Sequence, residues 1–327
     1  TSYVQNVSGI TVAVNKPVQI IGNTVAKLYN AGTGTLTHNV QGITVSGSSF
    51  IIDNTIYDLK SNSDANTDAN ISTSVGGIVH NGSTTGYASS IKGNRIYNLM
   101  NLNATTAAVN LIGIYFNGSS TLSNQISGNY IYNIIPNSNS TATTVYGIKI
   151  VSGLSTYANN IINLGGDYKS NYTGIYETGA VGNDNKFYFN TINISGTVNS
   201  GTNSSTALYS AVNTNVKEFK NNIFVNTRST TGGTNLHYAL YVASGTNSIT
   251  SDYNNYFVSG TGAVLGYYGA NVLTSTIVTG NDVNSVSTNP TFSSGNTNSA
   301  YNFYPAIRLT VTPISSINSD YLDRKSV

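Results

Sequence analysis

Short stretches of alternating apolar and polar residues recur along the whole chain, separated by turns rich in Gly, Asn and Ser. Such alternation predicts half-buried β-strands, and the apolar stripe that marks an amphipathic helix is missing. The stretches 91–99 (IKGNRIYNL) and 126–134 (ISGNYIYNI) spell nearly the same phrase, 35 residues apart. The pattern therefore predicts an all-β protein built from an internal repeat.

Two phrases mark each repeat. The first is Asn-x-apolar, which recurs every 30 to 40 residues at Asn23, Asn54, Asn94, Asn129, Asn159, Asn190, Asn221 and Asn254. The second is a small residue followed by an aliphatic one, and its small residue is Gly9, Gly42, Gly77, Gly113, Gly147, Gly174, Ala207, Ala239 or Ala263. A third apolar position precedes most of these Asn residues. Three short strands cannot bury an apolar face alone, whereas coils stacked on one another can.

The repeat predicts a right-handed parallel β-helix with three strands per coil and about nine coils. Equivalent residues of successive coils should lie above one another, so we expect Ile96 and Ile131 in one interior column and Asn94 and Asn129 at one turn. Asn suits this turn because it tolerates a left-handed backbone and its amide can bond to amides of neighbouring coils. The variable insertions fall between the Asn-x-apolar strand and the next Gly-Ile strand, so long loops are expected along one edge.

The last repeats carry a more specific pair of phrases. The chain reads SDYNNYFVSGTGAVLG from Ser251 and GNDVNSVSTNPTF from Gly280 to Phe292. This pair resembles the closing coils of parallel β-helix domains, of the pectin-lyase-like kind, in large secreted and cell-surface proteins of Bacteroidetes. Many relatives place a Trp before the second phrase, where this chain has none. Many of those proteins leave the cell by type IX secretion, so the resemblance implies an extracellular or cell-surface location.

The period is lost from about Ile277 onward. We therefore expect β-helix repeats over 1–276 and a C-terminal cap, or a linker to a following domain, over 277–327. The opening residues have no charged and apolar leader and look like the interior of a longer protein. Neighbouring domains of the same chain are therefore among the expected partners.

The composition limits the classes of other partners that can be expected. Only 8% of the 327 residues are charged, against about 25% in an ordinary soluble domain. The net charge is +2 and no basic cluster is present, so nucleic-acid binding is not expected. No apolar run is long enough to cross a bilayer, so membrane insertion is not expected either. The absence of Cys is compatible with secretion.

Catalysis on polysaccharides by a β-helix enzyme requires clustered carboxylates, with Arg or Lys to assist proton abstraction. The 12 acidic residues are scattered here, and only Glu177 and Glu218 are Glu. His38, His80 and His237 fall on separate coils. His80 and Glu177 share a column but lie three coils apart, which at the usual strand spacing is about 14 Å. No catalytic residue is predicted, and a polysaccharide lyase or hydrolase is the alternative function.

One loop offers oxygen donors at alternating positions, as calcium loops do. The donors are Asp64, Asn66, Asp68 and Asn70. The EF-hand pattern also requires a Gly at the sixth position and a bidentate Glu at the twelfth, where this chain has Ala69 and Val75. We expect no cofactor, with a weak calcium site as the alternative to a solvated polar loop.

Outward positions are rich in the 24 Tyr of the chain. If the aliphatic residue of each Gly-Ile pair points inward, the next residue points outward, and this column holds Tyr115, Lys149, Tyr176, Tyr209, Tyr241 and Leu265. The column after the Asn-x-apolar phrase holds Tyr57, Tyr97, Tyr132, Ile162 and Phe224. Stacked Tyr side chains can hold sugar rings by their apolar faces, and they also stabilise neighbouring strands by packing.

These observations together predict a non-catalytic extracellular adhesin or stalk domain of a large cell-surface protein. It would bind surface polysaccharide, or other cell-surface components, through the seven outward Tyr residues. A purely structural spacer is a further hypothesis, and it requires the Tyr columns to be covered by loops.

Overall fold

The computed structural model describes residues 4–14, 16–33, 37–82, 86–104, 107–179, 183–199, 202–212, 214–243 and 248–292. Within these ranges the chain forms 29 strands and no helix. No helix in the described ranges could therefore cross a membrane. Every strand pairing there is parallel except that between β28 and β29.

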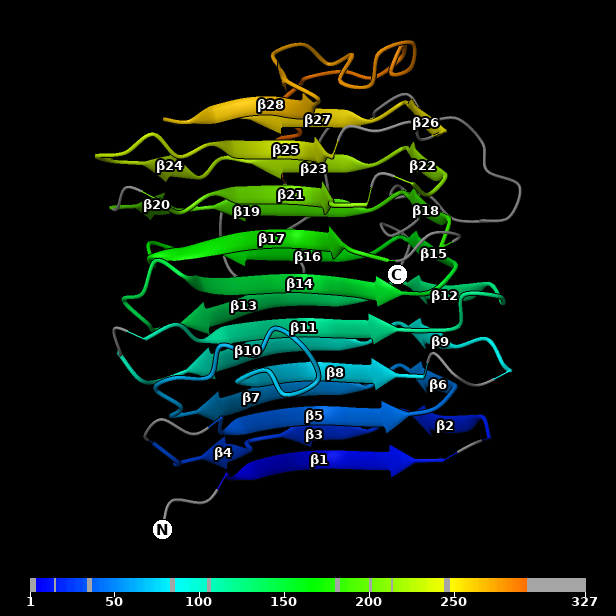
Figure 1. Ribbon diagram of the computed structural model, residues 1–327, viewed down its shortest axis with the longest axis vertical. Helices are drawn as coiled ribbons and strands as arrows, with labels where there is room; N and C mark the ends of the chain where they lie inside the picture. Colours follow the sequence, from blue (N-terminus) through cyan, green and yellow to red (C-terminus); the bar gives the residue numbers. More distant parts are fainter. Residues whose placement is uncertain are drawn as a thin grey trace.

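Three long sheets run the length of the molecule and are called A, B and C here (Figure 1). Sheet A contains β1 (Asn6–Ala13), β5 (Asn39–Ser46), β8 (Val75–Asn81), β11 (Asn110–Asn117), β14 (Thr143–Ser152), β17 (Ser170–Glu177), β21 (Ser205–Ser210), β25 (His237–Val242), β28 (Ala263–Tyr268) and β29 (Asn271–Val272). Sheet B contains β2 (Val18–Ile21), β6 (Ser49–Ile52), β9 (Ser90–Lys92), β12 (Asn124–Ser127), β15 (Ser155–Ala158), β18 (Asn185–Tyr188), β22 (Lys217–Lys220) and β26 (Ile249–Asp252).

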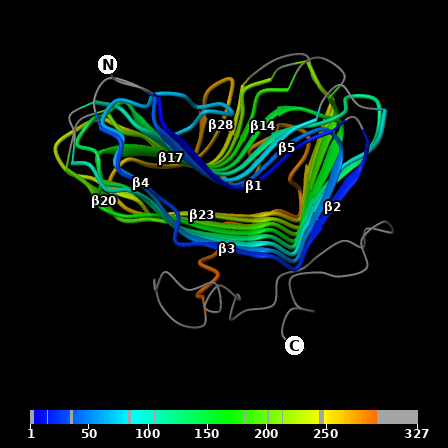
Figure 2. The same cartoon turned by 90° about the horizontal axis from the view of Figure 1, so that it is seen from below.

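Sheet C contains β3 (Thr24–Ala26), β4 (Tyr29–Asn30), β7 (Thr55–Ser61), β10 (Arg95–Asn101), β13 (Tyr130–Pro136), β16 (Ile161–Gly165), β19 (Thr191–Ser195), β23 (Ile223–Asn226) and β27 (Asn255–Val258). A small additional sheet pairs β20 (Thr197–Val198) with β24 (Ser229–Thr230). Figure 2 looks along the stack and shows the three long sheets enclosing the interior, with sheet A bent inward.

Each coil adds one strand to each sheet, so the predicted parallel β-helix with three strands per coil is confirmed. The number of coils is smaller than predicted. Sheet B has eight strands, so the chain makes seven turns between β2 and β26, rather than about nine. The last small-aliphatic pair that the sequence suggested, Ala263-Val264, lies in β28. There the chain leaves the coil and turns back as the antiparallel β29.

Stacked apolar side chains fill the interior. Ile96 pairs in register with Ile131, as predicted, and both are buried. In sheet B a column of Ile residues continues as the aromatic rings of Tyr157, Phe187 and Phe219, whose centroids are 5.1 and 5.3 Å apart. The same interior position in successive coils therefore accepts either branched aliphatic or aromatic side chains, provided that each stacks on its neighbour.

The small residue of the second phrase is required by the close approach of adjacent coils. A Cβ atom at Gly113 would lie 2.5 Å from the carbonyl oxygen of Gly147 and 2.7 Å from Cγ2 of Ile131. Such a contact is far inside van der Waals distance, so a larger residue would push neighbouring coils apart.

Asparagine side chains form a continuous ladder at the turn between sheets B and C. Its members are Asn23, Asn54, Asn94, Asn129, Asn160, Asn190, Asn222 and Asn254. The predicted members Asn159 and Asn221 were wrong by one residue. They occupy the position before the ladder, where their φ angles are 56° and 60° and where other coils have Gly93 or Gly128.

The segment after β29 closes the C-terminal end of the stack. Ile277 and Val278 are buried there. Asp282 is also buried, and its carboxylate accepts hydrogen bonds from the hydroxyls of Ser251, Tyr256 and Ser285 and from the backbone N–H of Val278. The two closing segments, which begin at Ser251 and Gly280, are thus joined by these hydrogen bonds. Residues 293–327 lie outside the described ranges, so the domain boundary at 276 stays a prediction.

Candidate binding surfaces

Four half-buried tyrosines form a row along the outer face of sheet A. This row, the A row, consists of Tyr176, Tyr209, Tyr241 and Tyr267. Successive ring centroids are 5.2, 4.4 and 4.3 Å apart, and the last three rings lie within 4° of parallel with their neighbours. The sequence had placed Leu265 in this column, but the register of β25 and β28 sets Tyr267 opposite Tyr241.

Tyr115, the other tyrosine predicted for this column, is separated from the A row and is buried. It packs with Val79 and Ile112 on the outer face of sheet A. The loop 62–74 crosses this part of the face in front of β8 (Figure 1). The Lys149 ammonium donates to the carbonyl oxygen of Ala69 in this loop. Carbonyl oxygens of the same loop accept hydrogen bonds from Gln41 of β5 and Asn110 of β11. The loop therefore covers the sheet A face between β5 and β14, and Tyr115 is unavailable to a ligand.

A second row, the C row, lies on the outer face of sheet C. It consists of Tyr57, Tyr97 and Tyr132, with centroids 5.0 and 4.9 Å apart and rings within 4° of parallel. Ile162 and Phe224, which the sequence placed in this column, point inward and are buried. Their displacement follows from the one-residue error at Asn159 and Asn221.

The stacking of the tyrosine rings determines which of their atoms are accessible to a ligand. Because each inner ring has neighbours on both faces, a ligand meets ring edges and hydroxyl groups rather than open aromatic faces. Burial raises the pKa of the Tyr241 hydroxyl to about 12, so the group is neutral at physiological pH. A neutral phenol both donates and accepts hydrogen bonds.

His80 and Glu177, the two titratable residues that the sequence places in one column, lie inside the solenoid. His80 and Glu177 belong to one column of sheet A, three coils apart, as predicted. The His80 ring stacks on Phe116 at 4.9 Å and its Nε2 lies 2.9 Å from Ser89 Oγ. Burial lowers the pKa of His80 to about 4. The fully buried side chain is therefore neutral near pH 7 and has no access to substrate.

Glu177 is equally inaccessible. Its carboxylate accepts hydrogen bonds from Asn185 Nδ2 at 2.7 Å and Ser210 Oγ at 2.5 Å, and burial raises its pKa. Glu218, the other Glu, is half-buried on sheet B, where it is paired with Lys220 at 2.5 Å and hydrogen-bonded by the Tyr188 hydroxyl. Neither Glu belongs to an exposed pair of carboxylates.

The proposed calcium ligands lie in the loop that covers sheet A. Asn66 is buried, and its amide is used within the fold: Nδ2 donates to the carbonyl oxygens of His38 and Ser72, while Oδ1 accepts from the N–H of Asp68. Asn70 Oδ1 accepts from the N–H of Ser72. These amides shape the loop, and Asp64 and Asp68 are its two carboxylates. No group of three His, Asp or Glu side chains in the described ranges could hold a metal ion, and calcium binding stays a prediction.

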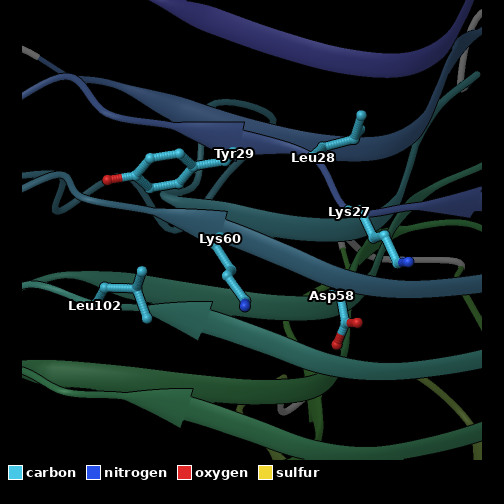
Figure 3. Close-up of a pocket in the computed structure, with 6 residues that line it drawn as sticks. All are labelled: Lys27, Leu28, Tyr29, Asp58, Lys60 and Leu102. Carbon is cyan, nitrogen blue, oxygen red and sulfur yellow. The ribbon is translucent and has the colours of Figure 1, made fainter.

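Two pockets on the sheet C side were not predicted from the sequence. The first has a volume of about 450 Å³ and lies at the ends of β7 and β10 (Figure 3). It is lined by Lys27, Leu28, Tyr29, Asp58, Lys60 and Leu102. The second has a volume of about 570 Å³ and is lined by Asn133, Ile135, Gly165, Gly166, Asp167, Tyr168, Ser195 and Gly196. Each pocket combines a tyrosine with a carboxylate.

No model of a protein family, no curated protein and no solved structure matches the chain. The fold assignment therefore rests on the strand topology, and the narrower resemblance to secreted Bacteroidetes domains stays a prediction.

Proposed function

We propose that this chain is a non-catalytic solenoid domain of an extracellular or cell-surface protein, and that it holds polysaccharide along the outer face of sheet A. One observation carries the proposal. The described strands of sheet A contain two charged side chains, Lys149 and Glu177, and the only carboxylate is buried inside the solenoid. A face without an acid–base pair suits binding rather than bond cleavage.

The A row supplies the contacts in this proposal. Its tyrosines repeat at 4.3 to 5.2 Å along the solenoid axis. A linear polymer lying along that axis meets one neutral hydroxyl per coil, and sugar hydroxyls can pair with each of them. The row is half-buried rather than covered, which favours an adhesin over an inert spacer. The proposal also includes secretion by the type IX route, because the closing coils resemble those of domains in proteins that leave the cell in this way.

Isothermal titration calorimetry tests the proposal with four soluble neutral polysaccharides: dextran, arabinoxylan, galactomannan and mixed-linkage glucan. We expect at least one to bind, and we expect the double variant Tyr209→Ala/Tyr241→Ala to weaken that binding at least tenfold. Tyr87→Ala is the matched control, because Tyr87 is exposed and belongs to neither row. Equal affinity of the double variant and the unmodified protein would overturn the assignment to the A row.

A further inference from the structure

The larger pocket on the sheet C side has the composition of a sugar subsite. It combines one aromatic ring, Tyr168, with the carboxylate of Asp167, the amide of Asn133 and the hydroxyl of Ser195. Specific ligand pockets pair an apolar surface with a few placed polar groups. A pyranose ring offers the same pairing in reverse, with an apolar C–H face and hydroxyls around its edge.

Three glycines with unusual backbone form part of the pocket wall. The φ angles of Gly165, Gly166 and Gly196 are 140°, 122° and 107°, a region that side chains rarely tolerate. A Cβ atom at Gly196 would lie 2.5 Å from the carbonyl oxygen of Gly166, and one at Gly166 would lie 2.9 Å from Cε2 of Tyr168. The wall is therefore bare backbone, and the Tyr168 ring lies directly against it.

A buried arginine holds the pocket loop from inside the solenoid. The Arg228 side chain is fully buried, and its two terminal nitrogens each donate a 2.6 Å hydrogen bond, one to the carbonyl oxygen of Ser170 and one to that of Tyr168. Its guanidinium lies 4.6 Å from the ring centroid of Tyr172. Burying a cation is costly, and these two hydrogen bonds offset only part of that cost, because Nε of Arg228 has no hydrogen-bond partner among the described residues. The guanidinium thus fixes the backbone that carries Asp167 and Tyr168 on the outer side.

The aromatic ring of this pocket differs from those of the two rows. No aromatic side chain in the described ranges stacks on Tyr168, which is half-buried. The pocket also lies next to the C row, because Asn133 directly follows Tyr132, its last member. Asp167 is fixed in place, since its Oδ1 accepts a 2.6 Å hydrogen bond from the N–H of Thr197.

We propose that this pocket is a subsite for a neutral pyranose unit of a linear polysaccharide. The sugar ring packs against Tyr168, and its hydroxyls donate to the Asp167 carboxylate and pair with Ser195. Asn133 borders the pocket with its Nδ2 donating to Oδ1 of Asn98. The inference rests on the proposed function for the class of ligand, but it uses a different face of the solenoid and different residues.

The test uses the same calorimetric titrations, with dextran, arabinoxylan, galactomannan and mixed-linkage glucan as probes. We expect Tyr168→Ala and Asp167→Asn each to weaken binding at least tenfold, with Tyr87→Ala unchanged. Asp167→Asn keeps the shape of the side chain and its acceptor for Thr197, so it serves if Tyr168→Ala fails to fold. Thermal melting of every variant checks the fold.

The outcomes separate the two proposals. Binding that survives both pocket variants but is lost in Tyr209→Ala/Tyr241→Ala overturns the subsite and leaves the A row as the binding surface. Binding lost in the pocket variants but unchanged in the A-row variant supports the subsite and overturns the A-row assignment. No binding of any of the four polysaccharides to the unmodified protein overturns both proposals.

Discussion

Asn94 donates a hydrogen bond from its side-chain Nδ2 to Oδ1 of Asn129, one coil along, over 3.0 Å. The backbone N–H of Asn94 donates to the same oxygen at 3.1 Å. Asn129 in turn donates to Oδ1 of Asn160 and to the carbonyl oxygen of Ile91. The inner ladder residues, from Asn54 to Asn222, are buried, and each bonds to backbone and side-chain groups of the coils on both sides.

Asn129→Ala should be strongly destabilising. The change removes the acceptor of two donors on Asn94 and the donor to Ile91, and each buried polar group left unpaired costs about 1–3 kcal/mol. We expect the free energy of unfolding, measured by urea denaturation, to fall by about 3 kcal/mol or more. Asn139→Ala is the control, since Asn139 is exposed, and should change stability by less than about 0.5 kcal/mol. Similar effects of the two changes would contradict the role of the ladder.

Gly113→Ala tests the close approach of the coils. The new methyl group would lie 2.5 Å from the carbonyl oxygen of Gly147, so the coils must separate or the strand must shift. We expect a loss of about 1–3 kcal/mol, as for other overpacked cores. Gly86→Ala provides a comparison, because nothing lies within 4 Å of its added Cβ. Thermal melting should show a lower Tm for the first variant only, and an unchanged Tm for Gly113→Ala would argue against the packing explanation.

His80 should make the fold sensitive to acid. Its folded pKa of about 4 lies below its ordinary value of 6.5, so the unfolded chain binds the proton more readily between those values. The contribution of neutral His80 to the free energy of unfolding is therefore fully present above about pH 6.5. It is lost as the pH falls toward 4, and the loss amounts to about 3 kcal/mol. Glu177 acts in the opposite direction, since its pKa is raised by burial.

Comparison of the unmodified protein with His80→Gln isolates the contribution of His80, because both proteins contain Glu177 and also His237, whose pKa burial likewise lowers to about 4. Urea denaturation between pH 7 and pH 4 should show a smaller loss of stability in the variant. Parallel pH profiles for the two proteins would mean that His80 is not buried in its neutral form.

Asp282→Ala should loosen the closing coil without disturbing the middle of the solenoid. The carboxylate of Asp282 joins Ser251, Tyr256 and Ser285 around the end of the core. Stability in stacked repeats is transmitted mainly between neighbours. Amide hydrogen exchange should therefore accelerate over 251–268 and stay unchanged over 75–150. Asp282→Asn, which keeps the Oδ1 acceptor, should have a smaller effect, and uniform acceleration along the chain would contradict this account.

The sequence patterns were sufficient to predict the coil and its repeated phrases, but they did not predict the strand register at every coil. Where the chain has Asn159 next to Asn160, both residues suit a left-handed turn, so the pattern cannot tell the turn residue from the ladder residue. In β28 the order of small and aliphatic residues is reversed, with Leu265 before Gly266. The reversal is tolerated because Ile277 of the closing segment, rather than another coil, packs against Gly266.

The candidate sites depended more strongly on tertiary structure. The covering of Tyr115 requires the path of a loop that starts one coil earlier, and no local pattern encodes that path. Arg228 gave no signal either, since an arginine in a polar stretch is normally exposed. Its burial follows from two backbone carbonyls that are brought to it from 58 and 60 residues away. The outward tyrosines were found because strand alternation alone places them.

The most direct test of a non-catalytic binding domain is to measure binding and cleavage on one sample. The unmodified protein is incubated with each of the four polysaccharides; affinity is measured by calorimetry, and the recovered polymer is sized by gel filtration. We expect binding of at least one polysaccharide with its chain length unchanged. Shortened polymer would establish a lyase or hydrolase, and absence of binding to all four would contradict the proposed function.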